Sequence, residues 1–190
     1  MKKLAFVAVL FFAVVTIASA QMGGPDKSKR PSPPASAECK FTDGKTIKMD
    51  YSSPRLNDPK THQPRKIFGS AEEKALVPYG AVWRTGANEA TTFVTDANLT
   101  VGGKEVAAGS YTIFTTPKAD AWTLIVSKKT GEWGTPYPGE KEDLARVPMS
   151  VAKTPALVEN FTIAFDQAGS KCTLRMEWEN TRASVEIAEK

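Results

Sequence analysis

Residues 161–187 read FTIAFDQAGSKCTLRMEWENTRASVEI and contain two stretches in which large apolar side chains alternate with polar ones. The apolar members are Phe161, Ile163 and Phe165 in the first stretch, and Leu174, Met176 and Trp178 in the second. A period of two is typical of a strand with one buried face, and the polar, glycine-containing segment 166–170 is typical of a turn. These residues therefore predict two antiparallel strands joined as a hairpin.

The same alternation recurs elsewhere in the chain, at Ile47, Met49 and Tyr51; at Tyr111 and Ile113; at Trp122, Leu124 and Val126; and at Val185 and Ile187. Glycine turns at residues 43–44 and 102–103 suit the connections between such strands. We predict about eight to ten short strands in an all-β single domain, an antiparallel β-sandwich or jelly-roll-like arrangement with long loops. Residues 141–146 offer one turn of helix, and we expect Trp122 and Trp178 to lie in the core.

Two polar segments interrupt the strand pattern. Residues 54–66, PRLNDPKTHQPRK, contain three prolines and should form an exposed loop. Residues 128–143 form a second long segment, in which Trp133 and Tyr137 favour an ordered loop. Long loops in a compact domain are either functional or disordered.

The first 20 residues have the features of an export signal. Lys2 and Lys3 precede the apolar run LAFVAVLFFAVVTIA, and small residues end the segment at Ala20. The run is shorter than the roughly 20 residues that span a bilayer, and no later stretch is apolar enough. We therefore expect cleavage near Ala20, a mature chain without a transmembrane segment, and a periplasmic or secreted location.

Residues 21–38 are rich in Pro, Ser, Gly and Lys, which is typical of a flexible leader. The remaining residues, 39–190, have the length of one domain. The net charge of the chain is +4, but five basic and two acidic residues precede Cys39, so the predicted domain has a net charge of about +1. That balance argues against a nucleic-acid partner.

The chain contains two cysteines, Cys39 and Cys172. In an exported protein an even count favours a disulfide. A cross-link that closes so long a loop stabilises the fold by about 4 to 5 kcal/mol on the chain-entropy account. The alternative is a pair of buried free thiols, and in either case we expect a structural role.

Residues 77–93, VPYGAVWRTGANEATTF, follow neither the strand period nor the helix period, and we refer to them as the central loop. Arg84 offers a rigid fork of donors for a carboxylate or phosphate, and Asn88 can both donate and accept hydrogen bonds. Tyr79 and Trp83 offer flat faces for a sugar or an aromatic group. The loop is a candidate ligand site. The alternative is a buried polar scaffold in which Trp83 belongs to the core.

Glu89 is the carboxylate within the central loop that suits acid–base chemistry. A glycosidase needs two carboxylates at a defined separation, one of them with a raised pKa, and Asp96, Glu132 and Asp143 are the candidates for the second. Nothing in their spacing selects one of them. A structural role, in which Glu89 pairs with Arg84 or with backbone donors, is the simpler interpretation.

No other motif points to catalysis. His62 is the only histidine, and its hydrophilic surroundings without a nucleophile motif favour a solvated side chain. One histidine and two distant cysteines make no zinc site, and neither a calcium-binding loop nor a phosphate-binding glycine loop is present. We therefore assign no catalytic residue, no metal ligand and no cofactor, and we lean against an enzyme.

Three functions remain under consideration. The first is binding of a small polar or glycan ligand at the central loop, helped by the aromatic residues of 128–143, which predicts a concave site beside Trp83 with Arg84 pointing in. The second is a structural or protein-interaction domain of the cell envelope, which predicts that Arg84, Asn88 and Glu89 are consumed by internal hydrogen bonds. The third, least favoured, is a carboxylate-dependent hydrolase with a second carboxylate within reach of Glu89.

Several motifs together resemble an exported bacterial family of unknown function, DUF2911. They are the central loop, AAGSYTIFTTP (107–117), WTLIVSK (122–128) followed by WG, RMEWENTRASVEI (175–187), YSSP (51–54) and RKIFG (65–69). The resemblance covers nearly all of residues 51–187 and implies an extracytoplasmic β-rich domain without a named activity. The chain departs from the family pattern where PRLNDPKTHQP lengthens the loop before RKIFG and where SAEEKA precedes LVPYG.

Overall fold

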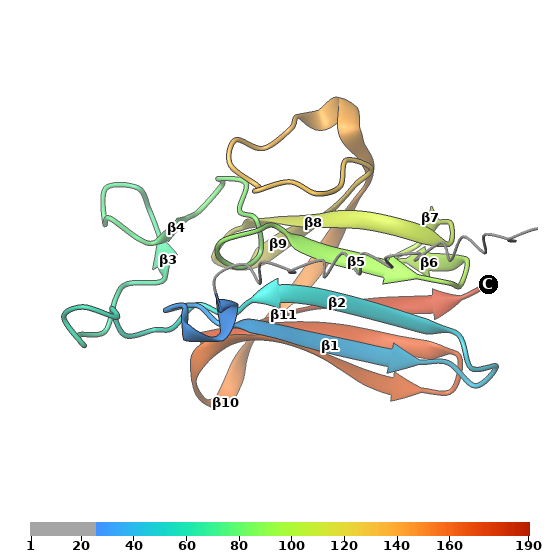
Figure 1. Ribbon diagram of the computed structural model, residues 1–190, viewed down its shortest axis with the longest axis horizontal. Coiled ribbons are helices and arrows are strands. Elements are labelled where there is room, and N and C mark those ends of the chain that lie inside the picture. Colours follow the sequence, from blue (N-terminus) through green and yellow to red (C-terminus); the bar gives the residue numbers. More distant parts are fainter. Residues whose placement is uncertain (1–25) are drawn as a thin grey trace, which may run out of the picture.

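The computed structural model describes residues 26–190, so the predicted export signal and the first part of the predicted leader lie outside the described residues. This part of the chain contains two short 3-10 turns and eleven strands (Figure 1). The turns are η1 (Lys27–Lys29) and η2 (Glu140–Glu142), and the strands are β1 (Pro34–Lys40), β2 (Thr46–Ser52), β3 (Phe68–Gly69), β4 (Val77–Pro78), β5 (Thr91–Thr95), β6 (Leu99–Val101), β7 (Lys104–Val106), β8 (Gly109–Pro117), β9 (Ala121–Ser127), β10 (Asp143–Ala168) and β11 (Lys171–Glu189).

Nine of the strands form one antiparallel sheet in the order β1-β2-β5-β8-β9-β10-β11-β6-β7. The predicted all-β class is confirmed. The hairpin predicted from residues 161–187 is present, because β10 and β11 pair in antiparallel register with Phe165 opposite Leu174. The other two strands, β3 and β4, form a short parallel pair beside one end of the sheet (Figure 1).

The last two strands are much longer than the short strands expected, with 26 residues in β10 and 19 in β11. The strands predicted around 174–178 and 185–187 are two parts of β11, because the chain continues through an irregularity at Glu179, where φ is 55°. The helical turn predicted at 141–146 is present only up to the end of η2 at Glu142. The prediction is wrong for the remaining residues, because β10 begins at Asp143.

The sheet bends until its second strand reaches its sixth. Three strands separate β2 from β10 in the sheet order, yet the segment after β2 bonds to β10. The Phe161 amide donates to the Pro54 carbonyl at 2.8 Å, and the Leu56 amide donates to the Glu159 carbonyl at 2.7 Å. Two layers therefore face each other, as expected for a sandwich, but both belong to one continuous sheet.

One hydrophobic core lies between the layers. The inward side chains of β2 and β11 illustrate it: Ile47, Met49, Tyr51, Leu174, Met176 and Trp178. Trp122 and Trp178 are 2% and 1% exposed, which confirms their predicted place in the core. The alternation of apolar and polar residues along the strands thus puts the apolar set inside, and hydrophobic burial of this kind is the main favourable contribution to folding.

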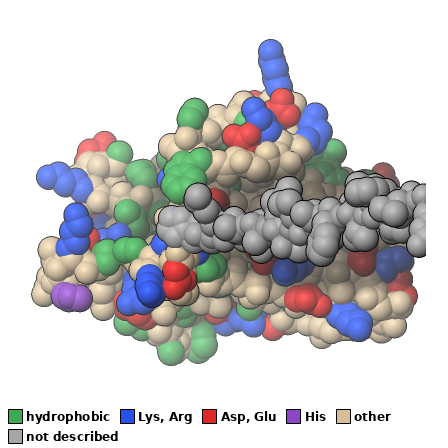
Figure 2. Space-filling model, in the orientation of Figure 1, with side chains coloured by type: hydrophobic (Ala, Val, Ile, Leu, Met, Phe, Trp, Pro, Cys, Tyr) green, Lys and Arg blue, Asp and Glu red, His purple; other side chains and the backbone are tan. Residues whose placement is uncertain are grey.

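Most outward positions carry polar and charged side chains, but on β8 and β9 the outward Phe114 and Ile125 are buried in a second, smaller cluster with Ala90. On β2, for example, Lys48 and Asp50 alternate with the buried residues and form an ion pair at 3.4 Å. On the face drawn in Figure 2, basic and acidic side chains are mixed over the strands, in line with the small net charge of the predicted domain.

The structure differs from the domain boundary expected at residue 39. β1 begins at Pro34, inside the segment 21–38 that we expected to be a flexible leader, and it pairs with β2. Its inward residues, Ala35 and Ala37, pack on the core but are too small to mark the segment as a strand by its apolar content. Proline is tolerated as the first residue of an edge strand.

A disulfide joins Cys39 at the end of β1 to Cys172 at the start of β11. Both residues are buried, and 133 positions separate them in the sequence. The bond therefore ties the edge strand β1 to β11, the seventh strand in the sheet order.

We expect the double variant Cys39→Ala/Cys172→Ala to lose about 4 to 5 kcal/mol of unfolding free energy, because the unfolded chain regains the freedom of a long loop. Urea unfolding followed by tryptophan fluorescence measures the loss. Wild-type protein reduced with dithiothreitol is the control and should lose a similar amount. A loss below about 1 kcal/mol in both proteins would show that the cross-link does not restrain the unfolded chain.

Candidate functional site

The central loop, residues 77–93, lies across the end of β8. The Trp83 amide donates to the Thr115 carbonyl at 2.8 Å, and the Thr115 amide donates back to the Trp83 carbonyl at 2.9 Å. The Gly80 amide donates to the Pro117 carbonyl at 2.9 Å. These bonds hold the first half of the loop against the last residues of β8.

The second half of the loop turns tightly. Thr85 and Asn88 both have a φ of 56°, a left-handed conformation that asparagine tolerates better than threonine. The buried Thr85 hydroxyl bonds to the Thr115 hydroxyl at 3.1 Å, which helps to hold this conformation. Gly86 is needed because a Cβ at this position would lie 2.9 Å from the Ser52 carbonyl oxygen. The path of the loop is therefore set by contacts with β2 and β8.

Trp83 belongs to an aromatic cluster and also borders a cavity. Its ring stacks on Trp178, with 6.0 Å between the ring centroids, and meets Phe161 edge-on at 4.8 Å. Its indole N–H donates to the Gly86 carbonyl at 3.0 Å. The side chain is half-buried. Trp83 therefore packs against the core, as one of the two interpretations expected, and it also lines the cavity.

Three segments line a cavity of about 260 Å³. The three segments are the central loop, the loop 54–66 and the residues just before β1. The residues lining the cavity are Trp83, Arg84, Gly86, Ala87 and Asn88, with Leu76 and Val77 before them, Pro54, Arg55, Pro59 and Arg65, Pro31 and Ser32, and Trp178.

Arg84 is held by two backbone carbonyls. Its Nη1 donates to the Asn88 carbonyl and, at 2.9 Å, to the Trp133 carbonyl. The guanidinium carbon also lies 5.8 Å from the centroid of the Trp133 ring, within the range of a cation–π interaction. Burial lowers the pKa of Arg84. Its Nε and Nη2 form no hydrogen bond with any part of residues 26–190.

Asn88 and Glu89 contact the segment before β1. The Asn88 side-chain amide donates to the Ser32 carbonyl at 3.0 Å. The Glu89 carboxylate pairs with Lys27 at 2.9 Å and with Arg30 at 2.8 Å. Lys27 above all, with the Glu89 backbone amide and Arg30, lowers the pKa of Glu89 from its usual 4.5 to about 2. The expected pairing of Glu89 with the arginine of its own loop is wrong, because the cations come from residues 27–30.

Four of the seven residues proposed from the sequence do not line the cavity: Glu89, described above, and Tyr79, Trp133 and Tyr137. Tyr79 is 41% exposed, and Trp133 is 54% exposed, with its ring over the guanidinium described above. Tyr137 packs edge-on against Phe114 at 5.1 Å. Burial and a hydrogen bond to Asp143 raise the pKa of Tyr137 to about 12. The structure thus brings only Trp83, Arg84 and Asn88 of the proposed set to the cavity.

Sequence reasoning missed two arginines of this site. Arg55 and Arg65 lie in the loop 54–66, which we expected only to be exposed. Neither has a local pattern that marks it as part of a site; the single available signal is that Arg65 opens the RKIFG motif. His62, from the same loop, is exposed as expected.

Each carboxylate considered as a partner of Glu89 has a partner of its own, and Glu132 lines the same hollow as Glu89. Of the partners considered for Glu89, Asp96 accepts from a backbone amide at 2.6 Å, Asp143 forms an ion pair at 2.7 Å, and Glu132 forms one at 3.6 Å. The pKa of Glu89 is lowered, which is the opposite of what a general acid requires. Within residues 26–190, no three His, Cys, Asp or Glu side chains gather in a way that would hold a metal ion.

We expect Glu89→Gln to lower the unfolding free energy at neutral pH by only about 0.5 to 1 kcal/mol, because the carboxylate is 39% exposed and water screens its ion pairs. Since folding lowers this pKa to about 2, the contribution is fully present above the ordinary pKa of 4.5 and is lost as the pH falls toward 2. Urea unfolding of both proteins from neutral pH down to acid measures the difference.

The difference between wild type and Glu89→Gln should shrink steadily once the pH falls below the ordinary pKa of the carboxylate. Glu72→Gln is the matched control, because the exposed Glu72 forms no ion pair in the part of the chain that the structure describes. A difference that stays constant across the acid range would contradict the assigned role of Lys27 and Arg30.

Residues 32–187 match the model of a family described as a protein of unknown function, DUF2911. No match was found among curated proteins or among solved structures. The matched range begins just before β1 and ends within β11, so it covers the central loop and nearly all of the sheet. The resemblance carried by the motifs of residues 51–187 is thereby confirmed. The chain belongs to the DUF2911 family of proteins of unknown function.

Proposed function

We propose that this protein is an exported domain that binds a small polar ligand or a glycan in the cavity beside Trp83. The observation that carries the proposal is the cavity itself, in which the half-buried Trp83 ring and the Arg84 guanidinium line the same space of about 260 Å³. Drug-sized sites have about 300 to 1,000 Å³, so this space suits a molecule of the size of a monosaccharide. An aromatic face and a few fixed polar groups are what such a ligand requires.

The internal hydrogen bonds of Arg84 and Asn88 support binding. They hold both side chains in place while these line the cavity. Side chains that are already ordered lose little conformational entropy when a ligand binds. The site is therefore preorganised, and its structural and binding roles are compatible.

A structural or protein-interaction role in the cell envelope is the second candidate. It is favoured by the same observation, since Arg84, Asn88 and Glu89 all have internal partners. The 54% exposed ring of Trp133 is a side chain that a protein partner would cover. We propose no hydrolase, because the lowered pKa of Glu89 does not suit a general acid.

Export is part of the proposal. Its support is the signal-like sequence of residues 1–20 and the disulfide between Cys39 and Cys172, a bond that persists in oxidising compartments. Among the described residues, no helix has the length and apolar character needed to cross a membrane.

We expect mass spectrometry of the protein purified from expressing cells to show a chain that begins at Gln21, because a signal peptidase would cut after the small residues that end at Ala20. Cell fractionation should place this shortened chain outside the cytoplasm. An intact chain that still begins at Met1 and stays in the cytoplasm would refute export.

We expect a thermal-shift panel of sugars, sugar acids, sugar phosphates, amino acids and nucleotides to contain a compound that raises the Tm by several degrees. Saturation at about 100 times the Kd adds roughly 2.7 kcal/mol of stability. Ala87→Phe should abolish the shift, because the new ring would fill the cavity that Ala87 lines.

Val94→Phe is the matched control for this experiment. It adds similar bulk at a 42% exposed position of β5 outside the cavity lining, so the shift should persist. If Ala87→Phe still shows the Tm shift, the ligand binds elsewhere, and the proposal that it binds in the cavity is refuted. No shift with any compound would leave the interaction role as the better account.

A further inference from the structure

The arginines of residues 26–190 fall into two groups. One group forms ion pairs with carboxylates, and its members are Arg30, Arg146, Arg175 and Arg182. The other group forms no ion pair anywhere in the described chain, and its members are Arg55, Arg65 and Arg84. The unpaired arginines are the three that line the cavity beside Trp83.

The lining of the cavity contains no aspartate or glutamate of residues 26–190. Two carboxylates, Asp58 and Glu159, line a neighbouring hollow that shares Arg55 with the cavity. Backbone hydrogen bonds from Thr61 and Lys60, helped by the charge of Arg65, lower the pKa of Asp58. Both carboxylates accept hydrogen bonds from backbone amides. Asp58 accepts from the Lys60 and Thr61 amides at 2.8 and 3.0 Å, and Glu159 accepts from the Asn57 amide at 3.1 Å.

The three guanidinium groups differ in how they are held and in how many hydrogen-bond donors they leave unused. Arg65 donates from Nε to the Leu56 carbonyl at 3.4 Å and from Nη2 to the Arg55 carbonyl. Arg84 is held through Nη1, while its Nε and Nη2 are unused within residues 26–190. The exposed guanidinium of Arg55 makes no hydrogen bond in the described chain, although the Arg55 backbone pairs with Asn160.

An anion is the ligand that this arrangement favours. Burial alone lowers the pKa of Arg84, and no carboxylate acts in the opposite direction. A partly buried charge without a counter-ion is unfavourable, and a bound anion removes that cost. The planar fork of arginine matches the two oxygens of a carboxylate or phosphate, and the apolar wall of the cavity strengthens the local positive potential.

We propose that the ligand is a small molecule with a carboxylate or phosphate group, which is bound by Arg55 and Arg84 beside Arg65 while a flat or apolar part lies against Trp83. This inference rests on the proposed binding function and names the chemical class of its ligand. Sugar acids and sugar phosphates have both features: a ring that can cover an aromatic face and an anionic group.

NMR titration of the ¹⁵N-labelled protein, purified after expression of the full chain, tests the anion directly. The probes are glucose, glucuronate and glucose 6-phosphate, which share one ring and differ in the group at one end. We expect at least one of the two anions to bind about tenfold or more tighter than glucose, in line with hydrogen bonds to charged groups. The shifted amides should be those of residues 83–88.

The possible outcomes distinguish two claims: that the ligand is an anion, and that the cavity binds a ligand at all. Glucose binding as tightly as both anions would overturn the anionic class and leave the cavity as a site for neutral ligands. The anionic class would also be overturned if none of the three probes binds while a neutral compound raises the Tm in the thermal-shift panel. No binding by any compound in either experiment would overturn the binding function as well.

Variants of Arg55 test whether the cavity arginines bind the anion. Arg55→Gln should weaken the binding of the tighter anion about tenfold and leave glucose unchanged, because it removes a charge whose side chain holds no other part of the fold. Arg55→Lys, which keeps the charge but not the fork, should lose less.

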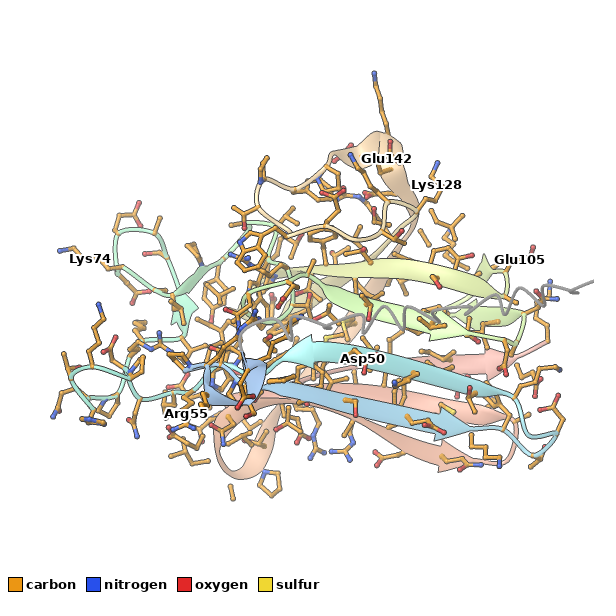
Figure 3. The ribbon with its side chains drawn as sticks, viewed as in Figure 1. Asp50, Arg55, Lys74, Glu105, Lys128 and Glu142 are labelled. Atoms are coloured by element: carbon orange, nitrogen blue, oxygen red, sulfur yellow. A yellow bond between two sulfur atoms is a disulfide. The ribbon has the colours of Figure 1, made fainter. Side chains whose placement is uncertain are left out.

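Lys128→Gln is the matched control, since it removes one exposed positive charge far from Arg55 (Figure 3). It should leave the binding of both anions unchanged. An equal loss in Lys128→Gln and Arg55→Gln would show a non-specific effect of net charge. Unchanged anion binding in Arg55→Gln would refute the role of the cavity arginines.

Discussion

Hydrogen bonds between the segment after β2 and the middle of β10 hold the two layers of the sheet together, and both the core and the cavity lie beside them. They bring the second strand of the sheet to the sixth and so enclose the core between two layers of one sheet. Arg55 lies between Pro54 and Leu56, the two residues whose backbones make these bonds. The pairing that encloses the core therefore also places an arginine at the cavity.

The aromatic cluster extends this enclosure to the central loop. Phe161 of β10 contacts the ring of Trp83 and also packs edge-on against Tyr51 of β2 at 5.7 Å. Trp83 in turn stacks on Trp178 of β11. Because aromatic rings bury large areas and prefer particular contact geometries, the loop is held at the point where β2, β10 and β11 meet. One side of the Trp83 ring packs in the core while the residue borders the cavity.

The strands could be predicted from the sequence because a buried face requires an apolar residue at every second position. That rule identifies β2, β8, β9, β11 and the last part of β10 from their own residues. It fails for β1, whose inward alanines bury little surface, and it cannot tell that residues 174–178 and 185–187 belong to one strand. In both cases the deciding factor is a contact with a distant segment, which a local pattern does not contain.

Periodicity, long motifs and the chemistry of single side chains were enough to predict the all-β class and the family, and to select Trp83, Arg84 and Asn88 as candidate site residues. Which charges are neutralised follows only from the folded structure. Glu89 pairs with Lys27 and Arg30, about 60 residues away in the sequence, while Arg55, Arg65 and Arg84 line one cavity whose lining contains no carboxylate of residues 26–190. Ion pairing depends on distance in space, and folding sets that distance for residues whose separation along the chain has no bearing on it.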